Sequence, residues 1–180
     1  MHGIIFVEFH KFVAEKLGPT AWNDVLRAAL PKARHYYRGN HYPDHEFADL
    51  LAAAASMAKV DLPDFGQQFG EVIAPDLMRM YAISIDSSWR TLEMIENTEV
   101  VIHTIVRRSL HGAAPPRLRV ERLGPNEIVL RYDSQRKMCY FAKGIALGVA
   151  KHFGESITIA ESMCMLKGAS HCEITFTSSG

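Results

Sequence analysis

The sequence lacks the features that mark several common protein classes. Lysine plus arginine number 20 and aspartate plus glutamate also number 20, so neither charge is in excess. That balance gives no support to non-specific binding of nucleic acid or of an anionic membrane surface. No apolar run approaches the roughly 20 residues of a membrane span. The first residues show no basic stretch followed by an apolar run and a small-residue cleavage site, so we expect no secretory signal.

Cysteine is also scarce. Three cysteines cannot complete a set of disulfides. We expect them to be reduced in a cytoplasmic protein, where they are available for metal binding or redox chemistry. The sequence also shows no nucleophile–base pair, no paired carboxylates at a useful spacing and no open metal site. We therefore do not expect an enzyme.

Apolar residues at helical spacing dominate the first part of the chain, about residues 1–85. The length of 180 residues and the 48% hydrophobic content suit a single domain spanning residues 1–180. We expect Thr20 and Asp44 to cap two helices and Pro75 to interrupt another. A longer helix should begin at Ser87-Ser88 and carry His103. The expected helices of the first part cover residues 3–17, 20–30, 47–58 and the segment after residue 63.

In the second part, about residues 86–180, apolar residues recur at every second position after Pro116, as in a strand. Residues 118–123 and 128–132 flank Gly124-Pro125-Asn126, which is typical of a hairpin. A helix over 138–153 follows, rich in small residues that allow close packing, and residues 156–163 and 171–177 indicate two more strands. The order predicts an α+β fold, with a helical subdomain followed by a four-stranded antiparallel sheet with interleaved helices.

A histidine and a Tyr-x-Ser-x-Arg strand are the first candidate site. His103 lies beside an apolar stripe of its helix, where a histidine is most often a boundary residue, although imidazole also ligates haem iron. Tyr132, Ser134 and Arg136 are each two residues apart, so their side chains would project from the same face if the strand continues through Arg136. Two hydroxyls and a guanidinium suit the binding of carboxylates. The alternative is an exposed strand end with a solvated arginine.

Together with the opening Met-His-Gly-Ile-Ile-Phe and the segment Ala114-Pro-Pro-Arg-Leu118, these residues make the chain resemble the haem–nitric oxide/oxygen binding (H-NOX, or HNOB) family. The resemblance implies ferrous haem b with His103 as the iron ligand. Counting back from Gly112 places the ligating position at His103 and not at Glu99. The resemblance also implies that the Tyr-x-Ser-x-Arg motif holds the propionates and that Pro116 presses on the porphyrin. The implied haem residues in the second part are His103, Pro116, Tyr132, Ser134 and Arg136.

The same resemblance concerns the gas pocket. Family members that bind oxygen stably use a distal tyrosine, and counting from Arg136 puts Phe141, not Tyr140, at that position. Phenylalanine cannot donate a hydrogen bond to bound oxygen. The implied ligand is nitric oxide, with carbon monoxide weaker, in preference to oxygen. The pocket would be completed by Ile5, Phe9 and Ile145.

The three cysteines form the second candidate site. Cys164 and Cys172 are symmetric about Gly168, so a turn there would bring them together, and Cys139 begins a neighbouring helix. Three unconnected core thiols are the alternative. A bacterial branch of the H-NOX family is similar in this region, and it implies a closed tetrahedral zinc site of Cys139, Glu161, Cys164 and Cys172. Oxidation of these thiolates would release zinc, which is a hypothesis for redox sensing. His171 is a competing ligand, but it should face the other way from Cys172.

The leading functional expectation is a haem-based nitric oxide sensor that signals to a separate protein. The resemblance implies a histidine kinase or a cyclic-dinucleotide enzyme as that partner. The alternative is a haem-free, zinc-stapled small-molecule sensor similar to vinyl-4-reductase domains. Such a sensor would need the zinc residues but not the motif from Tyr132 to Arg136.

Overall fold

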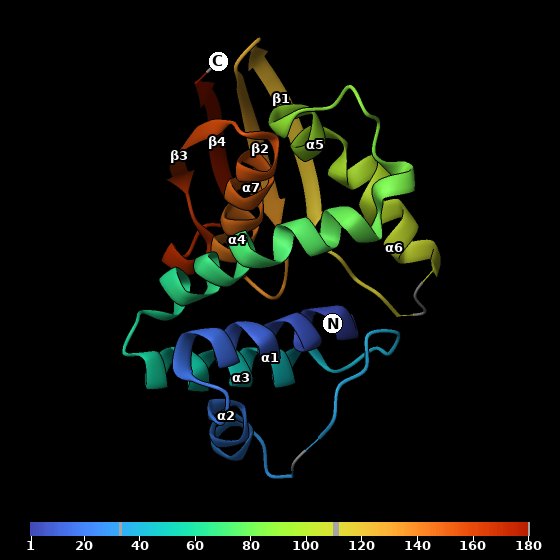
Figure 1. Ribbon diagram of the computed structural model, residues 1–180. Coiled ribbons are helices and arrows are strands. Elements are labelled where there is room, and N and C mark those ends of the chain that lie inside the picture. Colours follow the sequence, from blue (N-terminus) through green and yellow to red (C-terminus); the bar gives the residue numbers. More distant parts are fainter. Residues whose placement is uncertain (33, 110–111, 180) are drawn as a thin grey trace.

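The computed structural model describes residues 1–32, 34–109 and 112–179, and it has an α+β fold. Figure 1 shows the first three helices at one end of the molecule and the sheet at the other, with α4 between them and α7 in front of the sheet. No helix of the described residues has the length and apolar character needed to cross a membrane. The helices of the first part are α1 (Gly3–Leu17), α2 (Ala21–Ala29), α3 (Asp44–Ala58), α4 (Leu62–Met80) and the short η1 (Ala82–Ser84).

Aromatic residues hold the helical part together. Phe9 packs edge-on against Phe47 and Phe69, with ring centroids 5.2 and 4.9 Å apart. Six phenylalanines of this region are almost completely shielded from solvent, and burying rings of this size is a large favourable contribution to folding. They are Phe6, Phe9, Phe12, Phe47, Phe65 and Phe69.

Several helix ends differ from the expected ones. Helix α4 continues through Pro75 instead of being interrupted there. An interior proline costs about 3 kcal/mol, but the buried face formed by Phe69, Ile73, Ala74 and Met78 lies on both sides of it and outweighs that cost. Thr20 precedes α2 without a side-chain capping bond, and Asp44 is the first residue of α3 and not its cap.

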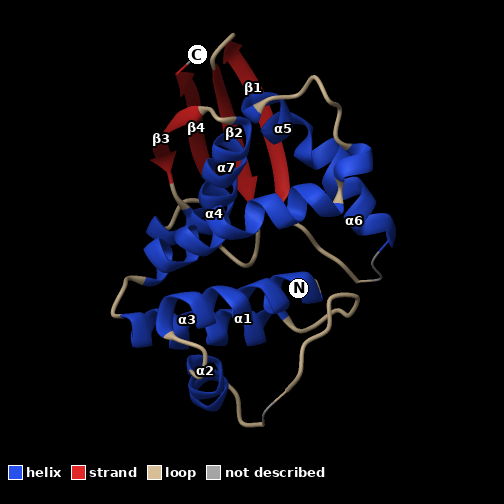
Figure 2. Ribbon diagram, in the orientation of Figure 1, coloured by secondary structure: helices blue, strands red, loops and turns tan. Residues whose placement is uncertain are grey.

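The second part contains a four-stranded antiparallel sheet in the order β1-β2-β4-β3. The expected hairpin is confirmed, since Val120 pairs with Leu130 and the turn falls at Gly124–Asn126. Figure 2 shows α7 lying across one face of the sheet. The elements are β1 (Arg117–Gly124), β2 (Glu127–Asp133), α7 (Cys139–Phe153), β3 (Ser156–Met163), η3 (Met165–Lys167) and β4 (Cys172–Ser179).

Glycines let α7 lie directly against α4. A Cβ atom on Gly148 would come within 2.3 Å of the carbonyl oxygen of Glu71, and one on Gly70 would come within 2.4 Å of that of Phe141. Real Cβ atoms do not approach so closely, so only glycine permits this backbone contact. The expectation of close packing by small residues of 138–153 is confirmed. The contact fixes the position of α7, which packs against both α4 and the sheet.

The segment expected to be one long helix from Ser87 is three consecutive pieces. They are α5 (Thr91–Asn97), a π-helical stretch η2 (Thr98–His103) and α6 (Thr104–Ser109). The start is later than expected because the Asp86 carboxylate binds both the amide and the hydroxyl of Ser88 in a turn. Helix α5 begins where Glu93 accepts the amide proton of Arg90.

Candidate functional site

An apolar cavity of about 260 Å³ lies between the helical layer and the sheet. Residues from α1, α4, the π-helical stretch, β1, β2 and α7 all reach it, so both parts of the chain contribute to its wall. A cavity with few polar groups suits a flat, largely apolar ligand. The apolar lining includes Ile5, Ala74, Met78, Ile102, Val106, Pro116, Leu118, Phe141, Ile145 and Ala146.

His103 lies in this wall at the last residue of the π-helical stretch. The wider turn has a local cause, because side chains occupy carbonyls that an α-helix would use. Asn97 Nδ2 donates to the Glu93 carbonyl at 2.9 Å and Thr98 Oγ1 donates to the Met94 carbonyl at 2.7 Å. Single π-helical turns are common at functional sites.

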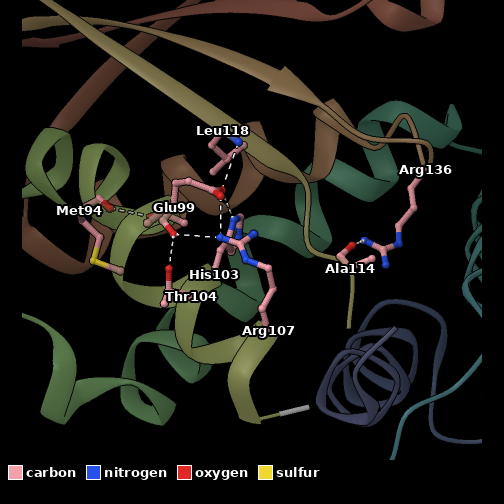
Figure 3. A network of polar contacts seen from close by, with 9 residues as sticks. Met94, Glu99, His103, Thr104, Arg107, Ala114, Leu118 and Arg136 are labelled. Carbon is pink, nitrogen blue, oxygen red and sulfur yellow. Dashed lines mark hydrogen bonds and ion pairs between the residues drawn. The ribbon is translucent and has the colours of Figure 1, made fainter. Parts of the chain in front are cut away.

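The His103 ring is held by a carboxylate (Figure 3). Its Nδ1 lies 2.9 Å from Oε2 of Glu99, and its side chain is 12% exposed. Burial lowers the pKa of His103, against the opposing influence of Glu99 and the Pro116 carbonyl. Burial thus favours the neutral imidazole, which is the form that ligates a metal.

The Tyr-x-Ser-x-Arg residues reach the site by a different geometry from the expected one. Strand β2 ends at Asp133, so the alternation of side chains along a strand applies to Tyr132 only, and the chain then turns through Ser134 to Lys137. Tyr132 and Arg136 line the cavity, whereas Ser134 does not. Ser134 instead accepts the amide proton of Arg136 at 3.3 Å and stabilises the turn. Burial raises the pKa of Tyr132 to about 12, so its hydroxyl keeps its proton.

Arg136 connects the two parts of the molecule. Its Nη1 donates to the Ala114 carbonyl at 2.7 Å, as Figure 3 shows, and its Nε lies 2.7 Å from Oδ2 of Asp44 on α3. Burial would raise the pKa of Asp44, but the interactions with Arg136 and with the N-terminal ammonium of Met1, 2.6 Å from Oδ1, outweigh it and lower that pKa. The guanidinium is thereby fixed at the edge of the cavity.

The expected gas pocket is only partly assembled as predicted. Ile5, Phe141 and Ile145 line the cavity, but Phe9 does not. Phe9 lies behind Phe69, whose ring stacks on Phe141 at 5.4 Å and separates Phe9 from the cavity. Of the two phenylalanines expected in the gas pocket, Phe141 alone lines the cavity.

Tyr140, the neighbour of Phe141, faces elsewhere. A Cβ atom on Gly66 of α4 would come within 2.4 Å of the Tyr140 ring, so this ring fills the space that the glycine leaves. Tyr140 is absent from the cavity lining among the described residues. Helix α7 therefore presents a phenylalanine, not a tyrosine, to the cavity.

The three cysteines and Glu161 form one cluster beside the sheet. One ligand atom from each of Cys139, Glu161, Cys164 and Cys172 lies within 4.8 Å of all the others. The Sγ atoms of Cys139 and Cys164 are 3.7 Å apart, which is too far for a disulfide. Three thiols and a carboxylate are a donor set that suits zinc.

The details of this cluster agree with a metal site. Glu161 Oε1 is buried without a hydrogen bond from the described residues, and its nearest cation is Lys143 Nζ at 3.5 Å. An unpartnered buried carboxylate oxygen is costly unless a cation occupies the site. Burial, together with the neighbouring thiols, raises the pKa of Cys139, so a metal would have to displace its proton. His171 contacts Ser170 and Glu173 and is not part of the cluster.

Three charged residues at these sites were not anticipated from the sequence. Glu99 contacts His103, Asp44 contacts Arg136 and Lys143 contacts Glu161. The Glu99–His103 pair has helical i, i+4 spacing, which was a readable signal. Asp44 is 92 residues from Arg136 in the sequence, so nothing local indicated that contact.

Comparisons with known proteins agree on the family. A family model described as Haem-NO-binding matches residues 2–161. Two solved H-NOX structures from S. oneidensis, a triple mutant in the Fe(II) state and a protein in the Fe(II)NO state, match with TM-scores of 0.93 and 0.92. Each is 28% identical and covers 100% of this chain, with 97% and 100% of those chains covered in turn.

A further structure supports the fold alone. The unliganded Fe(II) H-NOX protein from K. algicida matches with a TM-score of 0.90 at 23% identity over 100% of this chain and 97% of that one. A comparison with curated protein sequences gave no significant match. Because the family model covers most of its length, the chain belongs to the Haem-NO-binding, or H-NOX, family of haem-based gas sensors.

Proposed function

We propose that this protein senses nitric oxide through ferrous haem b ligated by His103 and signals to a separate protein. The observation that carries the proposal is a buried imidazole in the wall of an apolar cavity whose lining also includes Arg136 and Tyr132. Haem held here by His103, Tyr132 and Arg136 would supply an iron centre that binds a diatomic gas.

The residues of the cavity fit haem. The guanidinium of Arg136 and the hydroxyl of Tyr132 are donors at the edge of an otherwise apolar space, as the two propionates require. Ser134 supports this edge through the turn that carries Arg136. Pro116 lies in the wall, where it would press on the macrocycle.

The gas preference is proposed from the apolar wall. Ile5, Phe141 and Ile145 offer no donor to a bound gas, which favours nitric oxide, and more weakly carbon monoxide, over oxygen. Structures of the S. oneidensis protein in the Fe(II)NO and Fe(II)CO states show that a relative 28% identical to this chain binds both gases.

We further propose a structural zinc ion at Cys139, Glu161, Cys164 and Cys172, supported by the compact donor cluster.

A histidine kinase or a cyclic-dinucleotide enzyme is the proposed partner, in the cytoplasm. The signal to the partner would be a movement of the π-helical stretch, which carries His103, relative to β1, which it contacts through Glu99 and Leu118. We propose a sensor and not an enzyme.

The test is an absorption spectrum of the reduced protein reconstituted with haem, with and without nitric oxide. The proposal expects a five-coordinate ferrous spectrum that shifts with nitric oxide at far lower concentrations than with oxygen and is lost in His103→Ala. The control His152→Ala changes a histidine on the far part of α7 that does not line the cavity. Absence of stable haem uptake, or uptake indifferent to His103, would favour the haem-free small-molecule sensor.

A further inference from the structure

We propose that Glu99 is a positioning residue that orients His103 toward the iron and increases the donor strength of its imidazole. The inference deepens the proposed function and rests on it. Its structural basis is the 2.9 Å contact between Glu99 Oε2 and His103 Nδ1, together with the anchoring of the same carboxylate by two other elements.

The carboxylate has a fixed place independent of the histidine. Oε2 of Glu99 also accepts the amide proton of Leu118 on β1 at 3.2 Å, and Oε1 accepts a bond from Nη2 of Arg107 at 2.7 Å. Figure 3 shows Glu99 between the π-helical stretch, α6 and the start of β1. The side chain of Glu99 therefore links β1 to His103.

The protonation of the pair follows from these bonds. The Arg107 guanidinium and the Leu118 amide both donate to the Glu99 carboxylate, and donors of this kind stabilise its ionised form. An ionised carboxylate has no proton to donate, so the contact requires Nδ1 of His103 to carry the proton. In a neutral imidazole the lone pair is then on Nε2, which is the atom left to bind iron.

An acceptor on the far nitrogen changes the metal site in a known direction. A carboxylate that accepts the free N–H of a ligating histidine fixes the ring and makes the imidazole more basic. A more basic ligand strengthens the iron–histidine bond and favours the ferric state. Glu99 would thus set how firmly His103 holds the iron before a gas binds.

The experiment compares wild type, Glu99→Gln and Glu99→Ala as ferrous haem proteins by resonance Raman spectroscopy and redox titration. Glutamine keeps a neutral acceptor of the same shape, and alanine removes the acceptor. We expect the iron–histidine stretching band to shift to lower frequency and the reduction potential to rise, in the order wild type, glutamine, alanine. The matched control is Glu96→Gln, which removes a charge paired with Arg122 and not with His103.

A second measurement does not depend on haem. Nitrogen-15 shifts of the His103 ring in the haem-free protein should show an Nδ1–H tautomer in wild type and its loss in Glu99→Ala. A proton on Nε2 in wild type, donated to the Pro116 carbonyl, would overturn the inference. So would an unchanged band and potential in both haem-loaded variants. That second result would leave the gas-sensor proposal intact, because the variants would still take up haem through His103.

Discussion

A Cβ atom on Gly144 would lie 2.0 Å from the carbonyl oxygen of Gln67, so α7 and α4 meet through their backbones. The obstacle is a main-chain oxygen, which cannot rotate away as a side chain could. This contact sets the distance between the helix that carries Phe141 and Cys139 and the helix that carries Ala74 and Met78. The cavity and the cysteine cluster both depend on it.

Gly144→Ala is therefore expected to destabilise the protein. Overpacking costs about 1–3 kcal/mol, while alanine returns about 1 kcal/mol of helix propensity. Since backbone must move, we expect a net loss of up to about 2 kcal/mol in the free energy of unfolding, measured by urea denaturation. The control Lys151→Ala alters an exposed residue of the same helix and should have little effect. Equal stability of Gly144→Ala and wild type would show that the helices separate at no cost.

The proposed zinc site predicts different results for neighbouring residues. Cys172→Ala and Glu161→Ala each remove a ligand and should lower zinc affinity by more than about 100-fold, since losing an outer-shell partner alone costs about 10–100-fold. His171→Ala should bind zinc like wild type, because His171 lies outside the cluster. Metal analysis and chelator competition measure both. Loss of zinc in His171→Ala would identify the histidine as the fourth ligand instead of Glu161.

The Asp44–Arg136 ion pair predicts an acid dependence of stability. The folded-state pKa of Asp44 is lowered below its unfolded value. Its stabilising contribution is therefore complete above about pH 4, the unfolded pKa, and is lost as pH falls through the folded pKa. Wild type should exceed Asp44→Asn in unfolding free energy at pH 7, and the difference should shrink toward pH 3 in urea titrations. A difference that stays constant with pH would contradict the ion pair.

The apolar gas wall predicts the effect of adding a donor. Phe141→Tyr brings a hydroxyl to the cavity, and a hydrogen bond to bound oxygen is worth about 1–1.5 kcal/mol. Oxygen dissociation, followed by flash photolysis, should slow by about tenfold. Tyr140→Phe is the matched control and should leave gas binding unchanged, because that ring packs against Gly66. Faster oxygen loss in the control would place Tyr140, not Phe141, at the gas.

The sequence by itself determined the elements and most of the donor residues. Period two around Gly124–Asn126 gave the hairpin, and helical spacing gave α1, α3 and α7 close to their observed bounds. These patterns are local, because the spacing of apolar residues within one strand or helix already shows which of its faces is buried. His103, Arg136 and the cysteines could be singled out from the sequence because residue type and the resemblance to the H-NOX family can be read without a structure.

Only the tertiary structure decided which of these residues meet. Ile5 and Phe9 are one helical turn apart on α1, yet Ile5 lines the cavity while Phe69 separates Phe9 from it. Asn97 and Thr98 widen the helix before His103, and Glu99 then joins that histidine to β1. Contacts of this kind depend on packing between segments that are distant in the chain. If a helix is rotated by one residue, a side chain that lines the cavity is replaced by one that packs in the core.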